Sequence, residues 1–256
     1  MPTPCDLAGR GVLVTRPKGQ AAGLSHLIEA AGGRAIPFPT LWIEPAADPE
    51  AARRLLLEPM DLLVFTSRNA VDHALTLCPG GRLPAAARLA AVGKATAEAL
   101  AAAGRAPDLV PAGRYDSEAL LALPELQDLR GYRAVIVRGE GGRPLLGETL
   151  RARGADLAYA EVYRRVLPEV DAAALLARWE REVQLVIATS GEILANLMHL
   201  LGEAGRGRLL ATPLAVVSER TREDAWRQGF QRVEVAARAD DPALIAALCR
   251  LAEEKR

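Results

Sequence analysis

The sequence lacks an excess of charge of either sign and lacks any long hydrophobic run. Its 32 basic residues balance 32 acidic residues. This balance argues against a broad nucleic-acid-binding surface, which would show as a basic excess. No apolar stretch approaches the ~20 residues that span a bilayer, and residues 1–10 show no basic region followed by an apolar one. We therefore expect a cytoplasmic protein with neither a nucleic acid nor a membrane as partner.

Metal-ligating residues are also few. The chain has three cysteines and three histidines. The cysteines form no CxxC pair, and the histidines show no HxxxH or ExxH spacing, which are the patterns typical of metal sites. We expect no bound metal.

An internal repeat is the most informative feature that is present. The chain is long enough for one large domain or two ordinary ones, and four of its segments recur in one order at offsets of 123 to 125 residues. The matching pairs are 12–16 with 135–139, 62–67 with 185–190, 89–96 with 214–221, and 116–123 with 241–248.

The repeated segments alternate between strand-like and helix-like patterns. Short apolar runs such as 12–15 and 135–137 suit strands buried on both faces. Segment 20–31 places Leu24, Leu27, Ile28 and Ala31 on one face of a helix. Glycines 32, 104, 154 and 229 are expected to end helices. This alternation predicts an α/β fold with mostly parallel sheets and helices on both faces.

Two proline-bounded, extended segments interrupt this rhythm, at 37–45 and 159–168. They are rich in the scarce aromatic residues and are interpreted as connectors between domains. The repeat alone favours tandem halves divided near residue 130. The connectors favour cuts near 40 and 165, with the middle of the chain inserted into the rest. Composition does not choose between the two divisions.

Polar residues gather where the predicted strands end and helices begin. Ligands bind at the carboxyl ends of parallel strands, and helix N-termini there offer N–H groups and partial positive charge to anions. An alternative for each serine or threonine is simple N-capping. The candidate ligand-binding residues are Thr15, Arg16, Ser67, Arg68, Gly93, Lys94, Thr96, Arg138, Gly139, Ser190, Gly191, Ser218 and Thr221.

Common catalytic signatures are missing. The sequence has no GxxxxGK[ST], no GxGxxG and no GxSxG motif. No carboxylate pair stands out as general acid and base. An enzyme of this kind is expected to work by holding a reactive substrate in one geometry.

Several short motifs occur in the order found in one known family. They are Val12–Pro17, Val64–Val71 with its Thr-Ser, Ala91–Thr96 with its glycine, Glu161–Tyr163, and Val217 followed by Thr221. On these motifs the chain resembles the uroporphyrinogen-III synthase family over nearly its full length.

The resemblance implies two flavodoxin-like α/β domains joined by a two-stranded connector. One domain would comprise residues 1–38 and 168–256, the inserted domain 45–160, and the connector strands 39–44 and 161–167. It also implies that hydroxymethylbilane is cyclised with loss of water and inversion of ring D through a spiro intermediate, without metal or organic cofactor. A monomer is expected, with a possible transient contact to the preceding pathway enzyme.

The resemblance also assigns roles to two side chains. Tyr163 is the expected catalytic residue, donating a hydrogen bond to the departing hydroxyl, with packing between domains as the alternative. Thr221 is expected to cap a helix and bind a carboxylate at once. Two other functions stay open: a non-catalytic two-lobed binding module for a small anionic ligand, and a sugar-nucleotide transferase, for which no acidic residue or histidine near a nucleotide site is evident.

Overall fold

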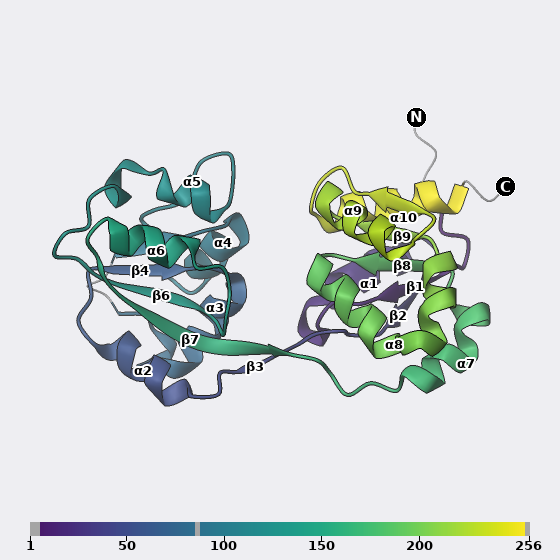
Figure 1. Ribbon diagram of the computed structural model, residues 1–256, viewed down its shortest axis with the longest axis horizontal. Helices are drawn as coiled ribbons and strands as arrows, with labels where there is room; N and C mark the ends of the chain where they lie inside the picture. Colours follow the sequence, from purple (N-terminus) through teal and green to yellow (C-terminus); the bar gives the residue numbers. More distant parts are fainter. Residues whose placement is uncertain (1–5, 85–87, 254–256) are drawn as a thin grey trace. The chain divides into compact units, whose positions relative to one another are not determined.

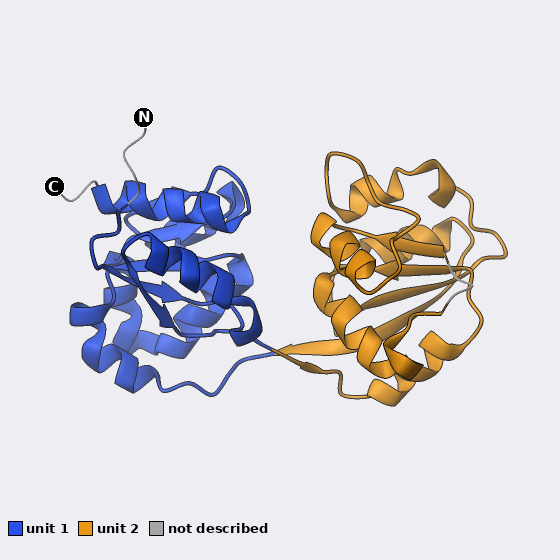
Figure 2. Ribbon diagram, turned by 180° about the vertical axis from the view of Figure 1, so that it is seen from behind, with its two compact units in different colours: residues 1–42, 166–256 blue, residues 43–165 orange. Residues whose placement is uncertain are grey.

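A computed structural model describes residues 6–84 and 88–253 of the chain. The chain divides into two compact units, residues 1–42 with 166–256 and residues 43–165 (Figure 2). We call them unit 1 and unit 2. In the described part of the chain, none of the helices has the length and apolar character needed to cross a membrane.

Unit 1 is built on a five-stranded sheet with the order β10-β9-β8-β1-β2 (Figure 1). Its neighbouring strands pair in parallel, with Val12 of β1 opposite both Ala35 of β2 and Leu185 of β8. In the unit's own chain order this is the doubly wound order of flavodoxin-like folds. The strands are β1 (Gly11–Val14), β2 (Arg34–Pro37), β8 (Leu185–Ala188), β9 (Leu214–Val216) and β10 (Val233–Val235).

Helices cover both faces of this sheet. One core joins strand residues to Leu24 and Ile28 of α1 and to the apolar side of α10. The other joins the opposite strand faces to Trp179 of α7 and to residues of α8 and α9. Strands β1 and β8 are buried throughout because both faces are covered. The helices are η1 (Lys18–Gln20), α1 (Ala22–Ala30), α7 (Ala172–Glu182), α8 (Gly191–Ala211), α9 (Glu219–Gln228) and α10 (Asp241–Glu253).

Unit 2 has a second five-stranded sheet, with the order β3-β7-β6-β4-β5. Strand β4 pairs in parallel with β5 and β6, and β6 with β7. The strands are β3 (Trp42–Pro45), β4 (Leu62–Phe65), β5 (Arg88–Ala91), β6 (Arg133–Gly139) and β7 (Asp156–Val166). The helices are α2 (Pro49–Leu57), α3 (Arg68–Leu77), η2 (Pro79–Gly81), α4 (Lys94–Ala102), α5 (Ser117–Leu121), η3 (Pro124–Leu126) and α6 (Leu145–Ala152).

Two cores sandwich the second sheet as well. Residues of α2, α3 and α4 pack on the face that carries Phe65 and Val137. Residues of α5 and α6 pack on the face that carries Val64 and Ile136. The predicted α/β class with parallel sheets is therefore confirmed. The four glycines expected to end helices all have positive φ, between 72° and 102°, as residues just beyond a helix C-terminus often do.

The sequence repeat is visible as equivalent positions in the two sheets. Strand β1 lies between β2 and β8, and its repeat partner β6 lies between β7 and β4. Likewise β8 and β4 are each followed in sheet order by the repeat-related β9 and β5. Each unit thus combines one repeat segment from one half of the chain with three from the other half: 12–16 with 185–190, 214–221 and 241–248 in unit 1, and 135–139 with 62–67, 89–96 and 116–123 in unit 2. The sheets do not follow tandem halves divided near residue 130.

The second extended segment is a strand of unit 2 over most of its length. Strand β7 runs from Asp156 to Val166 and pairs with β6 as far as Tyr163. Residues 161–163 therefore belong to the sheet of unit 2, because β6 continues beside them to Gly139. The domain limits proposed from the sequence stay a prediction, and their ends at 1–5 and 254–256, with the internal residues 85–87, lie outside the described residues.

Candidate active site

A cavity of about 310 Å³ opens at the carboxyl edge of the sheet of unit 2. It lies where β4 and β6 end, the two neighbouring strands whose chain connections lead in opposite directions along the sheet. Such switch points are the usual ligand sites of open parallel sheets. The lining residues are Thr66, Ser67, Val92, Ser117, Ile136, Arg138, Gly139, Gly141, Gly142, Arg143, Leu146, Gly147, Tyr159, Tyr163 and Arg165.

Tyr163 reaches this cavity through an irregularity in β7. The register between β6 and β7 shifts between Arg138 and Gly139, so that Gly139 lies opposite Tyr163. Tyr163 then packs in the same core as Ala160 and Val162, although strict alternation would place it on the opposite face. Strand irregularities of this kind re-aim side chains. Gly139 makes room, since a Cβ there would lie 2.5 Å from Cε2 of Tyr163.

The Tyr163 hydroxyl lies within a small polar group. It is 3.2 Å from Oγ of Ser67, and Nη1 of Arg165 donates to it at 3.5 Å. Ser67 also accepts from the Ala70 N–H as the N-cap of α3. The ring of His73, further along α3, lies 5.7 Å from the Tyr163 ring. Burial lowers the pKa of His73 below 6.5, against a smaller opposing effect of the Asp72 charge.

Arg138 is held at the same edge by two residues of β7. Glu161 accepts from Nη2 at 2.8 Å and from Nε at 3.2 Å. The guanidinium carbon lies 3.8 Å from the centre of the Tyr159 ring, a cation–π contact. Arg138 is thus a cavity-lining cation with restricted movement.

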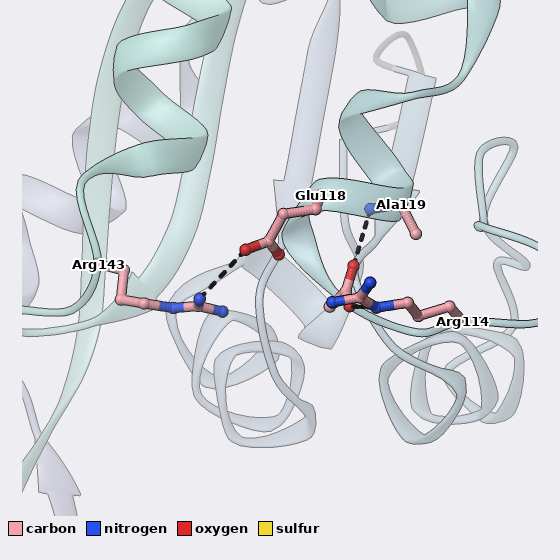
Figure 3. Close-up of polar contacts among 5 residues, drawn as sticks. Arg114, Glu118, Ala119 and Arg143 are labelled. Carbon is pink, nitrogen blue, oxygen red and sulfur yellow. Dashed lines mark hydrogen bonds and ion pairs between the residues drawn. The ribbon is translucent and has the colours of Figure 1, made fainter.

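The loop between β6 and α6 supplies a second arginine. Gly141 and Gly142 both have positive φ, and they lead into Arg143, whose Nη1 lies 3.4 Å from Oε1 of Glu118 on α5. Figure 3 shows these two side chains pointing toward one another.

The N-terminus of α5 lies beside this pair. Asp116 caps the helix by accepting from the Ala119 N–H, and it also pairs with Arg114. The bond from the Ala119 N–H, followed by those from Arg114, lowers the pKa of Asp116. The carboxylate therefore stays ionised and caps the first turn of α5, whose first residue, Ser117, lines the cavity.

Four residues expected from the sequence line the cavity, and four others of unit 2 do not. Ser67, Arg138, Gly139 and Tyr163 are among the lining residues. Arg68 and Lys94 are exposed and pair within their own helices with Asp72 and Glu98. Gly93 is the N-cap residue of α4, and Thr96 is buried in that helix.

In unit 1 the expected serines are helix caps. Ser190 accepts from the Ile193 N–H to begin α8, and Ser218 accepts from the Thr221 N–H to begin α9. The expectation that Thr221 caps its helix is wrong, because the chain enters α9 one turn earlier at Ser218. Thr221 is buried, and its hydroxyl lies 2.9 Å from that of Ser218.

The other expected residues of unit 1 are held by internal contacts. Thr15 is fully buried, and its hydroxyl donates to the carbonyl of Ile187 at 2.6 Å, which links β1 to β8. Arg16 forms an ion pair of 2.7 Å with Asp241 at the start of α10. Gly191 is the first residue of α8, and a Cβ there would lie 3.2 Å from Asp224 of α9.

Five polar side chains that line the cavity are absent from the set expected from the sequence: Thr66, Ser117, Arg143, Tyr159 and Arg165. Arg143 follows a glycine-rich loop after a strand, which is a signal that the sequence contains. Tyr159 lies within β7, and its role depends on the neighbouring strand. Among the described residues, no group of three or more acidic, histidine or cysteine side chains is placed to hold a metal ion.

Comparisons with known proteins agree on one family. The family model described as "Uroporphyrinogen-III synthase HemD" matches residues 22–246. The uroporphyrinogen-III synthase of Salmonella typhimurium is 41% identical over 243 residues, covering 93% of this chain and 99% of that protein. The Escherichia coli uroporphyrinogen-III synthase is 40% identical over 243 residues, with the same coverage. A crystal structure of a mutant uroporphyrinogen III synthase from Thermus thermophilus matches with a TM-score of 0.63 at 22% identity, covering 97% of this chain and all of that one.

Proposed function

Because the chain belongs to the uroporphyrinogen-III synthase family, we propose that it converts hydroxymethylbilane to uroporphyrinogen III. The reaction closes the linear tetrapyrrole with loss of water and inversion of ring D. The observation that carries this proposal is the cavity of unit 2, in which one buried tyrosine and three arginines converge. This combination suits a substrate that carries eight carboxylates and loses a hydroxyl group.

Tyr163 is the proposed catalytic residue. With Arg165 donating to its oxygen, the phenol O–H can be directed at Ser67 in the free protein and at the leaving hydroxyl of the substrate in the complex. A donor at that oxygen assists departure of hydroxide by partial proton transfer. Spontaneous loss of the hydroxyl is already possible, so the phenol assists a step that also occurs without it.

The remaining contacts are proposed to hold substrate carboxylates. In unit 2 these are Ser67, Arg138 and Gly139, with Arg68, Gly93, Lys94 and Thr96 at the neighbouring strand ends. In unit 1 they are Thr15, Arg16, Ser190, Gly191, Ser218 and Thr221. Since the hydroxyls of Thr15 and Thr221 have internal partners, any contribution from these two residues comes from the backbone. Binding contacts alone can direct ring closure, because about 1.4 kcal/mol between competing barriers changes a product ratio tenfold.

The wider setting follows from the same proposal. The chain is proposed to act as a cytoplasmic monomer without metal or organic cofactor, receiving its unstable substrate through a transient contact with the preceding pathway enzyme. We also propose that the two compact units correspond to the two functional domains, with limits near residues 38–45 and 160–168.

Separation of product isomers tests the activity. The chain is incubated with hydroxymethylbilane, and isomers I and III are separated after oxidation, with heat-denatured protein as the control. We expect isomer III with the native chain and isomer I with the control. Isomer I in both samples, together with saturable binding of hydroxymethylbilane, would instead show a non-catalytic binding module.

A further inference from the structure

Arg138 is held between two residues of the neighbouring strand. It lies opposite Glu161 in the register of β6 and β7, and Glu161 and Tyr159 are two residues apart, so their side chains share a face of the sheet. Among the described residues, the hydrogen bonds of Arg138 use Nε and Nη2. Nη1 is therefore the group available to a ligand in the cavity.

Tyr159 holds the guanidinium of Arg138 without offsetting its charge, whereas Glu161 does offset it. Glu161 orients the guanidinium but offsets its charge, which weakens attraction for an anion. The Tyr159 ring lies 3.8 Å below the guanidinium carbon and holds it without a formal negative charge. An arginine fixed in advance also loses less side-chain freedom when a ligand binds.

The packing of α6 provides space for Tyr159. Gly147 is buried in this helix, and a Cβ at that position would lie 1.8 Å from the Tyr159 hydroxyl and 2.7 Å from Cζ. Any side chain at residue 147 would displace the ring from its place under Arg138. The position of the ring thus depends on the absence of a side chain on a separate element.

We propose that Tyr159 is a positioning residue, which stacks on Arg138 to hold its guanidinium ready for a substrate carboxylate, and that Gly147 is the clearance this stacking requires. The inference rests on the proposed function, because it takes the carboxylate to be one of hydroxymethylbilane. It predicts an effect on substrate binding and none on the hydroxyl-loss step.

Steady-state kinetics of the full chain with hydroxymethylbilane tests the proposal. Tyr159→Leu should raise KM about 3- to 30-fold, the range of a cation–π contact, and leave kcat within about twofold, since uniform binding contacts change KM alone. Tyr159→Phe keeps the ring face and should stay near the wild-type KM. Arg151→Gln is the matched control, because Arg151 also lies over the Tyr159 ring, at 5.1 Å, but does not line the cavity. Its KM should be unchanged.

A double variant tests whether Tyr159 acts through Arg138. Arg138→Gln should raise KM by itself, and adding Tyr159→Leu should raise it no further, because residues that share one interaction are not additive. Gly147→Ala should also raise KM. Combining it with Tyr159→Phe should recover part of the loss, because the hydroxyl makes the shortest of the predicted clashes.

Several results would overturn the inference. They are a folded Tyr159→Leu chain with wild-type KM, equal effects of the Phe and Leu variants, and full additivity with Arg138→Gln. If Tyr159→Leu does not fold, Gly147→Ala, alone and combined with Tyr159→Phe, provides the test instead. A Gly147→Ala chain with unchanged KM contradicts the proposal. Each of these results leaves isomer III production by the wild type intact. Loss of isomer III from the wild type would overturn the proposed function instead.

Discussion

Two features of the backbone together position the Tyr163 side chain. The register shift beside Gly139 turns its side chain onto the face covered by α3, and the missing Cβ of Gly139 leaves room for the ring. On that face it meets Ser67 and His73, which a regular strand would not have brought to it. The motif Glu161–Tyr163 marks the residue in the sequence, but the shift that aims it is visible only in the structure.

Removal of the Tyr163 hydroxyl is expected to slow turnover without abolishing it. In Tyr163→Phe the ring still fills the space above Gly139, so the fold should persist. A proton donor typically contributes about 10²–10⁴-fold, and the loss is smaller where the uncatalysed step is easy. The measurement is kcat together with the product isomer, which should stay isomer III. A folded, product-binding variant with no activity would make Tyr163 an essential acid and would refute the idea of catalysis spread over many contacts.

His73 is expected to make stability depend on pH. Burial lowers its pKa in the folded protein below the value of 6.5, so the unfolded chain binds the proton more tightly. The stabilisation of the neutral imidazole is present above pH 6.5 and is lost as the pH falls from 6.5 through the lower folded pKa.

Urea denaturation between pH 5 and 8 measures this effect. In the wild type the urea concentration at the midpoint of unfolding should decrease as the pH is lowered below 6.5. The part of this decrease that comes from residue 73 should be absent in His73→Asn. Identical pH profiles for the two proteins, or an imidazole that titrates above 6.5 by NMR, would contradict the assignment.

At the scale of elements, the serines after the central strands begin the helices that follow. Ser67, Ser190 and Ser218 each accept from the N–H three residues later. The capping alternative raised from the sequence is therefore confirmed for all three. A cap and a ligand contact are compatible where the hydroxyl also faces a cavity, as that of Ser67 does.

The α9 cap separates the roles of Ser218 and Thr221. Ser218→Ala removes the acceptor for the Thr221 N–H and should lower the free energy of unfolding by about 0.5–2 kcal/mol. Thr221→Ala leaves that acceptor in place and removes one hydroxyl–hydroxyl bond, at about 0.5–1.5 kcal/mol.

Denaturant unfolding of both variants and of Ser218→Asp gives the comparison. Ser218→Asp should restore the cap. The double variant Ser218→Ala with Thr221→Ala should lose less free energy of unfolding than the sum of the losses in the two single variants. Strict additivity would show that the two hydroxyls do not share a bond.

The elements themselves were largely predictable. Apolar runs, serines and glycines set the strands, helix starts and helix ends, because each acts through local geometry. The positions of Tyr159 and Arg165 in the cavity were not predictable in the same way. Tyr159 acts across β6 and α6, and its partner Gly147 is an unremarkable helix residue until the packing is known.

At the scale of the whole chain, each unit contains repeat segments from both halves of the sequence. Matching segments of the two halves are separated by nearly equal offsets. The repeat alone therefore does not show which segments of the first half fold together with which segments of the second half. The structure unites the N-terminal segment with the last third and leaves 43–165 as a continuous unit. The family resemblance favoured this arrangement over the tandem one.

Residues 43–165 are expected to fold without the rest of the chain. This unit has its own sheet and two cores. Expressed alone, it should give an α/β circular dichroism spectrum and one cooperative unfolding transition, with residues 1–130 as the matched control that divides the chain at the tandem cut. A fragment 43–165 that is unfolded while 1–130 folds cooperatively would mean that the compact units are not independent domains.

We propose that this chain directs ring closure faster than the spontaneous reaction. The most direct measurement is the fraction of isomer III formed from a fixed amount of hydroxymethylbilane as the concentration of the chain is increased. We expect this fraction to rise from almost nothing to nearly all of the product, and Arg138→Gln should shift the rise to higher protein concentration. A fraction that stays near the spontaneous value at every concentration of folded protein would contradict a role of this chain in ring closure.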